Sequence, residues 1–429
     1  MGERRKINRA VTIVEGRECN QPVANELRDT AIAMGFDAKV LKKIPSTNIA
    51  EGTLDEVFSD CVIWRCPVEA KNTYETERVI SYLQNSGKLL INAQPAGGRF
   101  FSSDKYFQHG LFQLDPVVKE HSLEMHMALS RENIDDLLKR KKLKYPFLLK
   151  PDFGTRGEGI ILVKTKADLD KVKKFSYLST EPYVKSTYDW RVFVMGGVAL
   201  GAMKKQGDMA DVANFKSRAS GRKRWNEDDI NVMEEIGQLS VHAAEVSGLE
   251  YAGIDLIRDD ETGKFIVLET NIAAGWQNGF REATGISVPE ENINWFSDRA
   301  LLFESTTYKA VKTYCDRRIR FLTRAGQKNY NEIVNHERLI KRNREISNFD
   351  LEHKNMPLVR RLSSAYALLH EGRVTKEELA KIKMLIASIE EYEISRFGNF
   401  IGKDSGSLED SILRTAYYIA VKEKLDAKK

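Results

Sequence analysis

A chain of 429 residues is too long for one ordinary hydrophobic core, and at roughly 100–200 residues per domain it predicts roughly two to four folding units. Hydrophobic residues make up 42% of the chain, charged residues 30%, and prolines number only ten, which excludes a disordered or low-complexity chain. The net charge of +5 is unevenly placed, because residues 309–345 carry eleven Lys or Arg against four Asp or Glu and leave the rest slightly acidic.

The first hundred residues alternate short apolar runs with helical patterns. The start, MGERRKINRAVTIVEG, has no apolar stretch long enough for a signal peptide, and no later run approaches the roughly 18 apolar residues of a membrane span. We therefore expect a cytoplasmic protein without a membrane partner. Strand-like runs AVTIVEG, DAKVLKKI, DCVIWRC and KLLINA are separated by helical patterns near 23–34 and 74–85. This rhythm predicts an open α/β sheet with helical crossovers.

A strand-rich region begins near Pro146, and its first motif is YPFLLKPDFGTRGEGIILV at 145–163. Lys150 ends an apolar strand, glycines follow at 154, 157 and 159, and a second strand comes next. Glycines let backbone N–H groups approach phosphate oxygens, and the lysine supplies a compact positive charge. The strand that follows excludes the P-loop and dinucleotide fingerprints, which need a helix there. The motif fits a polyphosphate site, with a plain glycine hairpin as the alternative.

The next motif is a hairpin whose two-residue turn is a pair of glycines at 196–197. A regular two-residue turn would place Asp189 opposite Lys204 and Arg191 opposite Ala202, all on one face of the hairpin. Polar side chains then gather at its open end. They predict either a charged lip over a nucleotide or an ordinary cross-strand ion pair on a solvated face.

The third motif, YAGIDLIRDDETGKFIVLETNIAA at 251–274, reads as two apolar strands around a polar turn. Glu269 and Asn271 are two residues apart and so share a face, and a five-residue turn from Asp260 to Lys264 puts Asp255 opposite Glu269. Opposed carboxylates among apolar neighbours are destabilising unless positive charge lies between them. Because an oxygen-only set of Asp, Glu and Asn suits a hard cation, we predict a magnesium site rather than a strand cap and a solvated acid.

Beyond about Asn294 the strand signals fade and the pattern becomes helical. Thr375 and Glu378 form a capping box before an amphipathic run, and a last helix is predicted to begin near Ser407. The four cysteines form no CxxC pair and the seven histidines are dispersed, which argues against a zinc site, a disulfide framework or a histidine metal site. We interpret the cysteines as small buried or reduced thiols.

Taken in this order, the motifs resemble the ATP-grasp superfamily, and specifically its RimK-like branch of amino-acid and peptide ligases, over about residues 10–300. The resemblance implies an α/β fold with a pre-ATP-grasp domain at 1–102 and an ATP-grasp domain at 103–295. The latter would divide into a small lid subdomain at about 130–184 and a large subdomain at about 185–295. Residues 296–429 would form a helical C-terminal domain that resembles no module we can name.

The resemblance also assigns roles to residues. It implies ATP-binding positions at Lys105, Lys150, Gly154, Thr155, Gly157, Gly159, Glu181, Pro182, Tyr183, Val184, Asp189 and Asn214. It implies that Asp255, Glu269 and Asn271 bind Mg²⁺, with Mn²⁺ as an alternative. Arg191 is the best candidate to stabilise an acyl phosphate, a role that Lys204 or Lys205 would share.

Two departures from the family pattern lie on the acceptor side. The family's AMxR strand is matched by AMKK at 202–205. Many relatives carry RxN and two glycines after this strand, whereas here Asn214 fits but Val212 or Ala213 stands where an arginine is usual. Lys216, Arg218 or Arg222 is a candidate replacement. The common SPG after the metal strand is replaced by AAG at 273–275. The departures leave the identity of the acceptor open.

By resemblance, the predicted reaction is phosphoryl transfer from ATP to a carboxylate of an amino acid, peptide or protein side chain, followed by attack of an amine on the acyl phosphate. One alternative is a small-molecule kinase of the same fold. Another is a nucleotide-sensing scaffold whose basic 309–345 segment contacts nucleic acid or protein, although we favour a solvated face for that segment. Many relatives are dimers or tetramers, so a homo-oligomer is also open.

Overall fold

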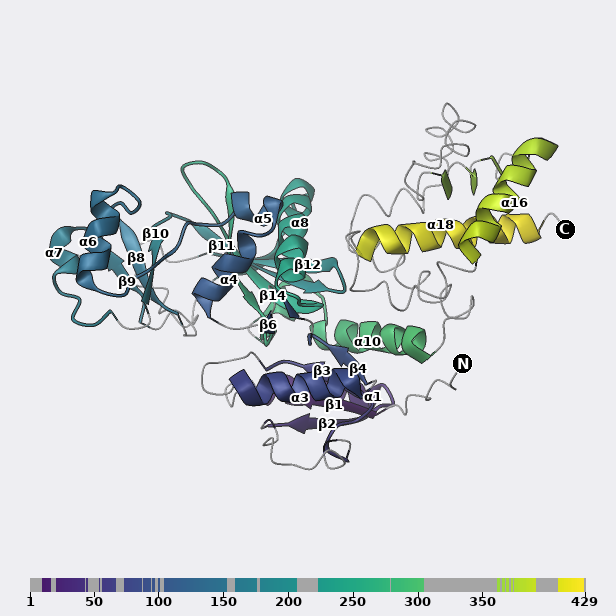
Figure 1. The fold of residues 1–429 in the computed structure, drawn as a ribbon, viewed down its shortest axis with the longest axis horizontal. Coiled ribbons are helices and arrows are strands. Elements are labelled where there is room, and N and C mark those ends of the chain that lie inside the picture. The colour runs from purple at the N-terminus through teal and green to yellow at the C-terminus, as the bar shows by residue number, and fades with distance from the viewer. Residues whose placement is uncertain are drawn as a thin grey trace. The chain divides into compact units, whose positions relative to one another are not determined.

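The computed structural model describes residues 10–16, 21–42, 44, 54, 56–66, 73–86, 88–93, 95–96, 99–100, 104–152, 159–175, 178–206, 223–277, 279–304, 361–362, 365–366, 368–369, 372, 374–390 and 408–427 (Figure 1). Its contacts divide the chain into two compact units, one over residues 8–293 and one that contains residues 294–429. Helix α10 (Val288–Glu304) spans the division.

The larger unit begins with a parallel sheet. Its strands are β1 (Ala10–Val14), β2 (Asp37–Leu41), β3 (Cys61–Trp64) and β4 (Leu89–Ile91), in the order β2-β1-β3-β4, with α1 (Gln21–Ala33) and α3 (Thr73–Asn85) between them in the chain. All four residues of β3 are buried, as expected of a parallel strand covered on both faces. The predicted open α/β sheet is confirmed. Cys61 and Cys66 are buried free thiols, whereas Cys19 and Cys315 lie outside the described residues.

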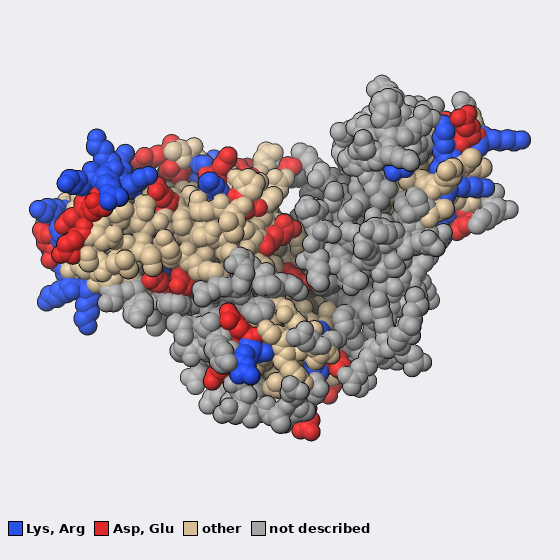
Figure 2. Space-filling view, in the orientation of Figure 1, with Lys and Arg blue, Asp and Glu red and all other residues tan. Residues whose placement is uncertain are grey.

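A short ladder of β5 (Pro95–Ala96) and β6 (Arg99–Phe100) leads to α4 (Lys105–Phe112) and α5 (Pro116–Glu120). A small antiparallel sheet follows, in the order β7-β10-β8-β9, from β7 (His126–Met127), β8 (Phe147–Pro151), β9 (Ile161–Val163) and β10 (Leu178–Pro182). Buried side chains of β8 and β9 form its core with Ile134 of α6 (Arg131–Lys139) and Leu169 of α7 (Lys166–Leu169). Figure 2 shows Lys and Arg gathered with Asp and Glu on this subdomain, where pairs such as Arg131 with Asp135 and Asp170 neutralise one another.

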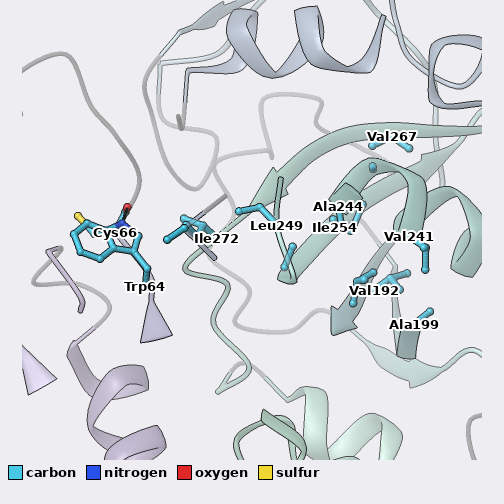
Figure 3. Packing of buried hydrophobic residues seen from close by; sticks show 14 of the residues in the cluster. Trp64, Cys66, Val192, Ala199, Val241, Ala244, Leu249, Ile254, Val267 and Ile272 are labelled. Carbon is cyan, nitrogen blue, oxygen red and sulfur yellow. Dashed lines mark hydrogen bonds between the residues drawn. The ribbon is translucent and has the colours of Figure 1, made fainter. Parts of the chain in front are cut away.

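The central sheet is antiparallel and has the order β13-β12-β11-β14-β15. Its strands are β11 (Tyr188–Met195), β12 (Val198–Gln206), β13 (Arg224–Asn226), β14 (Tyr251–Arg258) and β15 (Phe265–Asn271). One face packs on α8 (Ile230–Val246), with side chains such as Val192, Ile254 and Val267 buried against Val241 and Ala244 (Figure 3). Short helix α9 (Phe280–Thr284) follows the sheet. Because α8 covers one face of the central sheet, the polar residues that alternate with the buried ones along its strands lie on the opposite face.

Two bulges alter the predicted registers. The β11–β12 turn is at Gly196 and Gly197, as predicted, but the register shifts between Phe193 and Val194, so Asp189 pairs with Lys205 and not with Lys204. The β14–β15 connection is one residue longer than predicted, because Arg258 pairs with Phe265. A second bulge compensates, and Asp255 does lie opposite Glu269. The predicted facing of Asp255 and Glu269 is confirmed, and that of Asp189 and Lys204 is wrong.

Asn92, directly after β4, joins the parallel sheet to the central sheet. It has a positive φ of 63°, and its side-chain amide accepts from the N–H of Tyr251 and donates to the carbonyl of Tyr251, both at 2.7 Å. It is only 3% exposed. The amide thus takes the place of a neighbouring strand at the start of β14.

Replacing Asn92 by Ala is expected to lower the free energy of unfolding by about 3 kcal/mol, because two buried backbone groups lose their partner and Ala tolerates positive φ poorly. Chemical denaturation measures the loss. Asn92→Gly removes the same hydrogen bonds but tolerates the backbone, so a difference between the two variants reports the strain. Equal stability of wild type and both variants would contradict this role.

The smaller unit is helical where it is described. Thr375 and Glu378 exchange the hydrogen bonds of the predicted capping box at the start of α16 (Lys376–Glu390). The last helix, α18 (Leu408–Asp426), lies where a helix starting near Ser407 is predicted. The basic segment 309–345 lies outside the described residues. No helix among those described is both long enough and apolar enough to span a membrane.

Candidate active site

The free face of the central sheet carries a cluster of acids and bases. The registers place Asp189, Arg191, Lys205, Asp255, Glu269 and Asn271 on this face. Arg191 is the cross-strand partner of Asp255, and Asp255 is in turn the partner of Glu269. Residues from three adjacent strands therefore meet at one place, as predicted for Arg191 and the three proposed ligands.

Arg191 neutralises the centre of the cluster. Its Nε and Nη2 donate to the two carboxylate oxygens of Asp255, each at 2.5 Å, and the two side chains are 19% and 18% exposed. Asn271 donates from Nδ2 to Asp255 and to Glu269, each at 3.2 Å. Lys205 forms an ion pair with Asp189 at 2.5 Å. The positive charge that opposed carboxylates require is therefore supplied by Arg191.

Burial opposes ionisation of Asp255, but the charges of Arg191 and Lys205 outweigh it and hold the pKa of the Asp255 carboxyl below its ordinary value. Burial likewise opposes the charge of Arg191, and its pair with Asp255 raises the guanidinium pKa instead. Both groups are therefore ionised near neutral pH. Asp255 is in the form that binds a cation.

The residues fit a divalent cation in their donor chemistry. Asp255 and Glu269 offer carboxylate oxygens from facing positions, and Asn271 touches both. Asn271 presents its nitrogen to them, and turning the amide over presents its oxygen to a cation. No cluster of three or more His, Cys, Asp and Glu suited to a metal occurs in the part of the chain that the structure describes. A divalent-cation site here would combine the two carboxylates with the amide of Asn271.

Lys150 and Glu181 form a second polar centre, on the small sheet. Lys150 Nζ lies 2.5 Å from Glu181 Oε1, and both side chains are under 10% exposed. Lys105, at the start of α4, donates its backbone N–H at 3.0 Å to the carbonyl of Asp152, two residues beyond Lys150. The structure thus brings the predicted Lys105, Lys150 and Glu181 into one region.

The glycine-rich loop is only partly described. Gly154, Thr155, Gly157 and, further on, Asn214 lie outside the described residues. Gly159 has φ 77°, and a Cβ there would lie 2.8 Å from the ring of Pro151. A glycine is therefore required at the point where the loop enters β9.

A narrow cleft separates the small sheet from β15. It is lined by His109, Phe112, Ser122, Leu123, Met125, Glu181, Val267 and Leu268. Of the predicted hinge residues, Glu181 lines this cleft. Glu181 and Pro182 end β10, and the N–H of Tyr183, just before Val184, donates to the carbonyl of Pro146 at 3.3 Å. Burial raises the pKa of Tyr183 and lowers that of His109, so both are neutral near pH 7.

Lys204 does not join the cluster. It lies on the opposite face of β12, 3.3 Å from Glu227 and over the rings of Tyr188 and Trp190 at 4.5 and 5.3 Å. Of the two predicted lysines, only Lys205 faces the carboxylates.

Sequence reasoning missed several residues of this region. Arg224 of β13 is the cross-strand partner of Lys205 and so shares its face, and His109 and Leu268 line the cleft. Arg224 and His109 belong to no motif with its own spacing, and Leu268 lies within the third motif only as an apolar neighbour of Glu269. Arg224 lies on a three-residue strand after an undescribed segment, and His109 is one polar residue on a short helix.

The segment after Asn271 is held by residues that follow the strands of the parallel sheet and by α1. Arg65, whose side chain is fully buried beside Glu15, donates to the carbonyl of Ala274 at 3.3 Å and lies 5.1 Å from the ring centroid of Trp276. Trp276 in turn donates to Glu26 at 2.9 Å. The AAG that departs from the resembled family is therefore fixed by buried contacts.

Comparisons with known proteins match the part of the chain that carries these residues. Residues 103–296 match the family described as the RimK-like ATP-grasp domain. A probable alpha-L-glutamate ligase 1 of Shewanella sp. strain MR-4 is 29% identical over 168 residues, covering 37% of this chain and 53% of that protein. Human N-acetylaspartylglutamate synthase A is 26% identical over 243 residues, covering 54% of this chain and 58% of its own. The matched stretch thus spans about half the length of these relatives.

Solved structures are similar in fold. The ATP-grasp ligase PsnB, in complex with a phosphomimetic variant of its minimal precursor, Mg and ADP, aligns with a TM-score of 0.51 at 14% identity and covers 68% of this chain and 99% of its own. The D-alanine–D-alanine ligase of Bacillus anthracis aligns with a TM-score of 0.50 at 15% identity and covers 68% and 97%. At these identities the likeness shows the fold alone.

Proposed function

We propose that this chain is a ligase that joins a carboxylate to an amine and converts ATP to ADP, because residues 103–296 match the RimK-like ATP-grasp domain family. The observation that carries the proposal is the facing pair Asp255 and Glu269, with Asn271 touching both and Arg191 paired to Asp255. Opposed acids next to an arginine are arranged to hold a cation and a phosphorylated group together.

In this proposal Asp255, Glu269 and Asn271 hold Mg²⁺, with Mn²⁺ as an alternative. The bound cation supplies charge neutralisation on the phosphates. Lys150 and Lys105 hold phosphate oxygens, and the cleft beside Glu181 and Leu268 takes the base of the nucleotide. No side chain acts as a covalent nucleophile, so catalysis consists of positioning and electrostatic stabilisation.

Arg191 is the proposed stabiliser of the acyl phosphate. Its planar guanidinium already binds the two oxygens of one carboxylate, the geometry that also suits a phosphoryl group. Asp189 lies two residues before it on β11, and Lys205, on the neighbouring strand β12, pairs with Asp189. Transfer of the γ-phosphoryl group would convert the carboxylate of one substrate into an acyl phosphate and release ADP. The amine of the other substrate would then attack the carbonyl carbon, lose a proton and displace phosphate.

The substrates proposed are amino acids or peptides. The similar proteins named as a glutamate ligase and an N-acetylaspartylglutamate synthase support this class. A cytoplasmic location and a homo-oligomer remain part of the proposal. The test is a matrix of amino acids and peptides assayed for ATP consumption, with mass spectrometry of the product. A ligase requires both an acid and an amine before ADP accumulates, whereas ADP formation with a phosphorylated single substrate would indicate a kinase.

The two neighbouring lysines provide a prediction about the active face. Lys205→Met is expected to lower kcat/KM by roughly 10- to 100-fold, because it removes a cation beside Arg191. Lys204→Met is expected to leave kcat within about twofold and to destabilise the fold by about 1 kcal/mol, through its lost contacts with Glu227 and two aromatic rings. Steady-state kinetics and denaturation of both variants check this. Equal kinetic losses would contradict the assignment of faces.

A further inference from the structure

Glu269 reaches the active face because β15 contains a bulge. Leu256 pairs with Val267, whereas its neighbour Asp255 pairs with Glu269, so Leu268 has no cross-strand partner. Adjacent strand residues point to opposite faces, and a slip of one residue reverses the facing of every side chain that follows. Without the bulge, Glu269 and Asn271 would point toward α8 and Thr270 toward the active face. Whatever holds the bulge therefore also holds the two proposed ligands.

Bulged edge strands need support, because one side of the strand lacks a strand partner. β15 is the last strand of its sheet. Before the bulge it is held by His121, whose carbonyl accepts from the N–H of Val267 and whose Nδ1 contacts the carbonyl of Phe265, both at 2.8 Å. After the bulge it is held by Gln108, whose Oε1 accepts from the N–H of Thr270 at 3.0 Å and from its hydroxyl at 3.3 Å.

Gln108 is well placed to act on the ligands. It is 3% exposed, and Thr270, which is 1% exposed, lies between Glu269 and Asn271 in the chain. Gln108 lies on α4, the helix that begins at Lys105 and contributes His109 to the cleft. One short helix thus touches both the proposed nucleotide cleft and the backbone of the proposed metal strand.

We propose that Gln108 is a positioning residue that keeps Glu269 and Asn271 on the active face by anchoring the backbone of Thr270 after the bulge. The inference rests on the proposed function, in which these two residues bind the cation. The anchoring of Thr270 by Gln108 does not rest on the proposed function, because their hydrogen bond and the bulge are features of the fold alone.

The test uses the full chain and the variant Gln108→Met, which keeps the length of the side chain and removes the acceptor. Ser247→Ala is the matched control, since Ser247 contacts the same Thr270 hydroxyl at 3.1 Å in an equally buried place but leaves the Thr270 N–H bonded to Gln108. Hydrogen exchange of the peptide that contains Thr270 is measured first. We expect exchange to be about fivefold faster or more in Gln108→Met, and unchanged at that N–H in Ser247→Ala.

Binding of Mn²⁺, followed by its electron paramagnetic resonance signal without turnover, is measured second. Supporting groups around metal ligands typically change affinity by 10- to 100-fold, so we expect the Mn²⁺ dissociation constant to rise by about tenfold or more in Gln108→Met and by less than about twofold in Ser247→Ala. The inference would be overturned if hydrogen exchange in Gln108→Met matched that of the wild type. It would also be overturned if the wild type bound Mn²⁺ and Gln108→Met bound it with the same affinity. A wild type that binds no Mn²⁺ would overturn the proposed function and the positioning role with it, even if the exchange result showed the anchor.

Discussion

Replacing Glu269 by Gln is expected to abolish magnesium-dependent ADP formation while the fold remains intact. The substitution keeps the size of the side chain and removes one of the two facing charges, so a cation loses a carboxylate ligand. We expect kcat/KM to fall by at least about 100-fold. Fold stability should hold or rise, because Asp255 then faces a neutral group and keeps its pair with Arg191. A coupled ADP assay over a range of Mg²⁺ concentrations and a thermal unfolding curve measure the two effects.

Glu261 supplies the control for this experiment. It lies in the exposed connection between β14 and β15, so Glu261→Gln removes the same charge from the same hairpin away from the active face. Its kinetics should match those of the wild type. If Glu269→Gln turned over ATP at an undiminished rate, the assignment of the metal site would be wrong, whatever the substrates are.

The alternation of side chains along a strand predicted correctly which residues share a face, where the prediction depended on residues within one strand. Glu269 and Asn271 share a face because they are two residues apart on β15. The facing of Asp255 and Glu269 also came out right, although through two deviations that cancel, a turn one residue longer and a bulge at Leu268. Local sequence patterns do not show a bulge, because it depends on what supports the strand edge from outside.

The same limit explains the error at Lys204. The turn of the β11–β12 hairpin was predicted correctly, yet the register shift at Phe193 exchanged the facing of every residue of β12 beyond it. Gly201 is the partner of Phe193 at this register shift. A Cβ at Gly201 would lie 2.6 Å from the side chain of Ile286, which is distant in sequence. Gln108 and Arg65 were likewise unpredictable, because their partners Thr270 and Ala274 lie more than 150 residues away. The resemblance to a family pointed to the residues that belong to its motifs. The roles of the other residues depend on tertiary contacts, which local sequence patterns do not show.

Arg191 is the residue whose replacement separates catalysis from metal binding. Arg191→Lys is expected to lower kcat by about 100-fold or more, since a lysine places one point charge where the guanidinium binds two oxygens at once. The apparent affinity for ATP should change little, because the lysines proposed to hold the nucleotide, Lys105 and Lys150, are untouched. Rapid-quench or steady-state kinetics at saturating substrates measure kcat directly.

Arg191→Met makes the complementary prediction, on stability. Without the guanidinium, Asp255 and Glu269 face each other with no cation between them, so the metal-free variant should unfold at a lower temperature than the wild type. Added Mg²⁺ then supplies the missing positive charge, and because a ligand that binds the folded state stabilises it, Mg²⁺ should raise the Tm of Arg191→Met by more than that of the wild type. An equal rise in both proteins would mean that the cation does not bind at these carboxylates. A full kcat in Arg191→Lys would mean that the reacting phosphoryl group lies elsewhere.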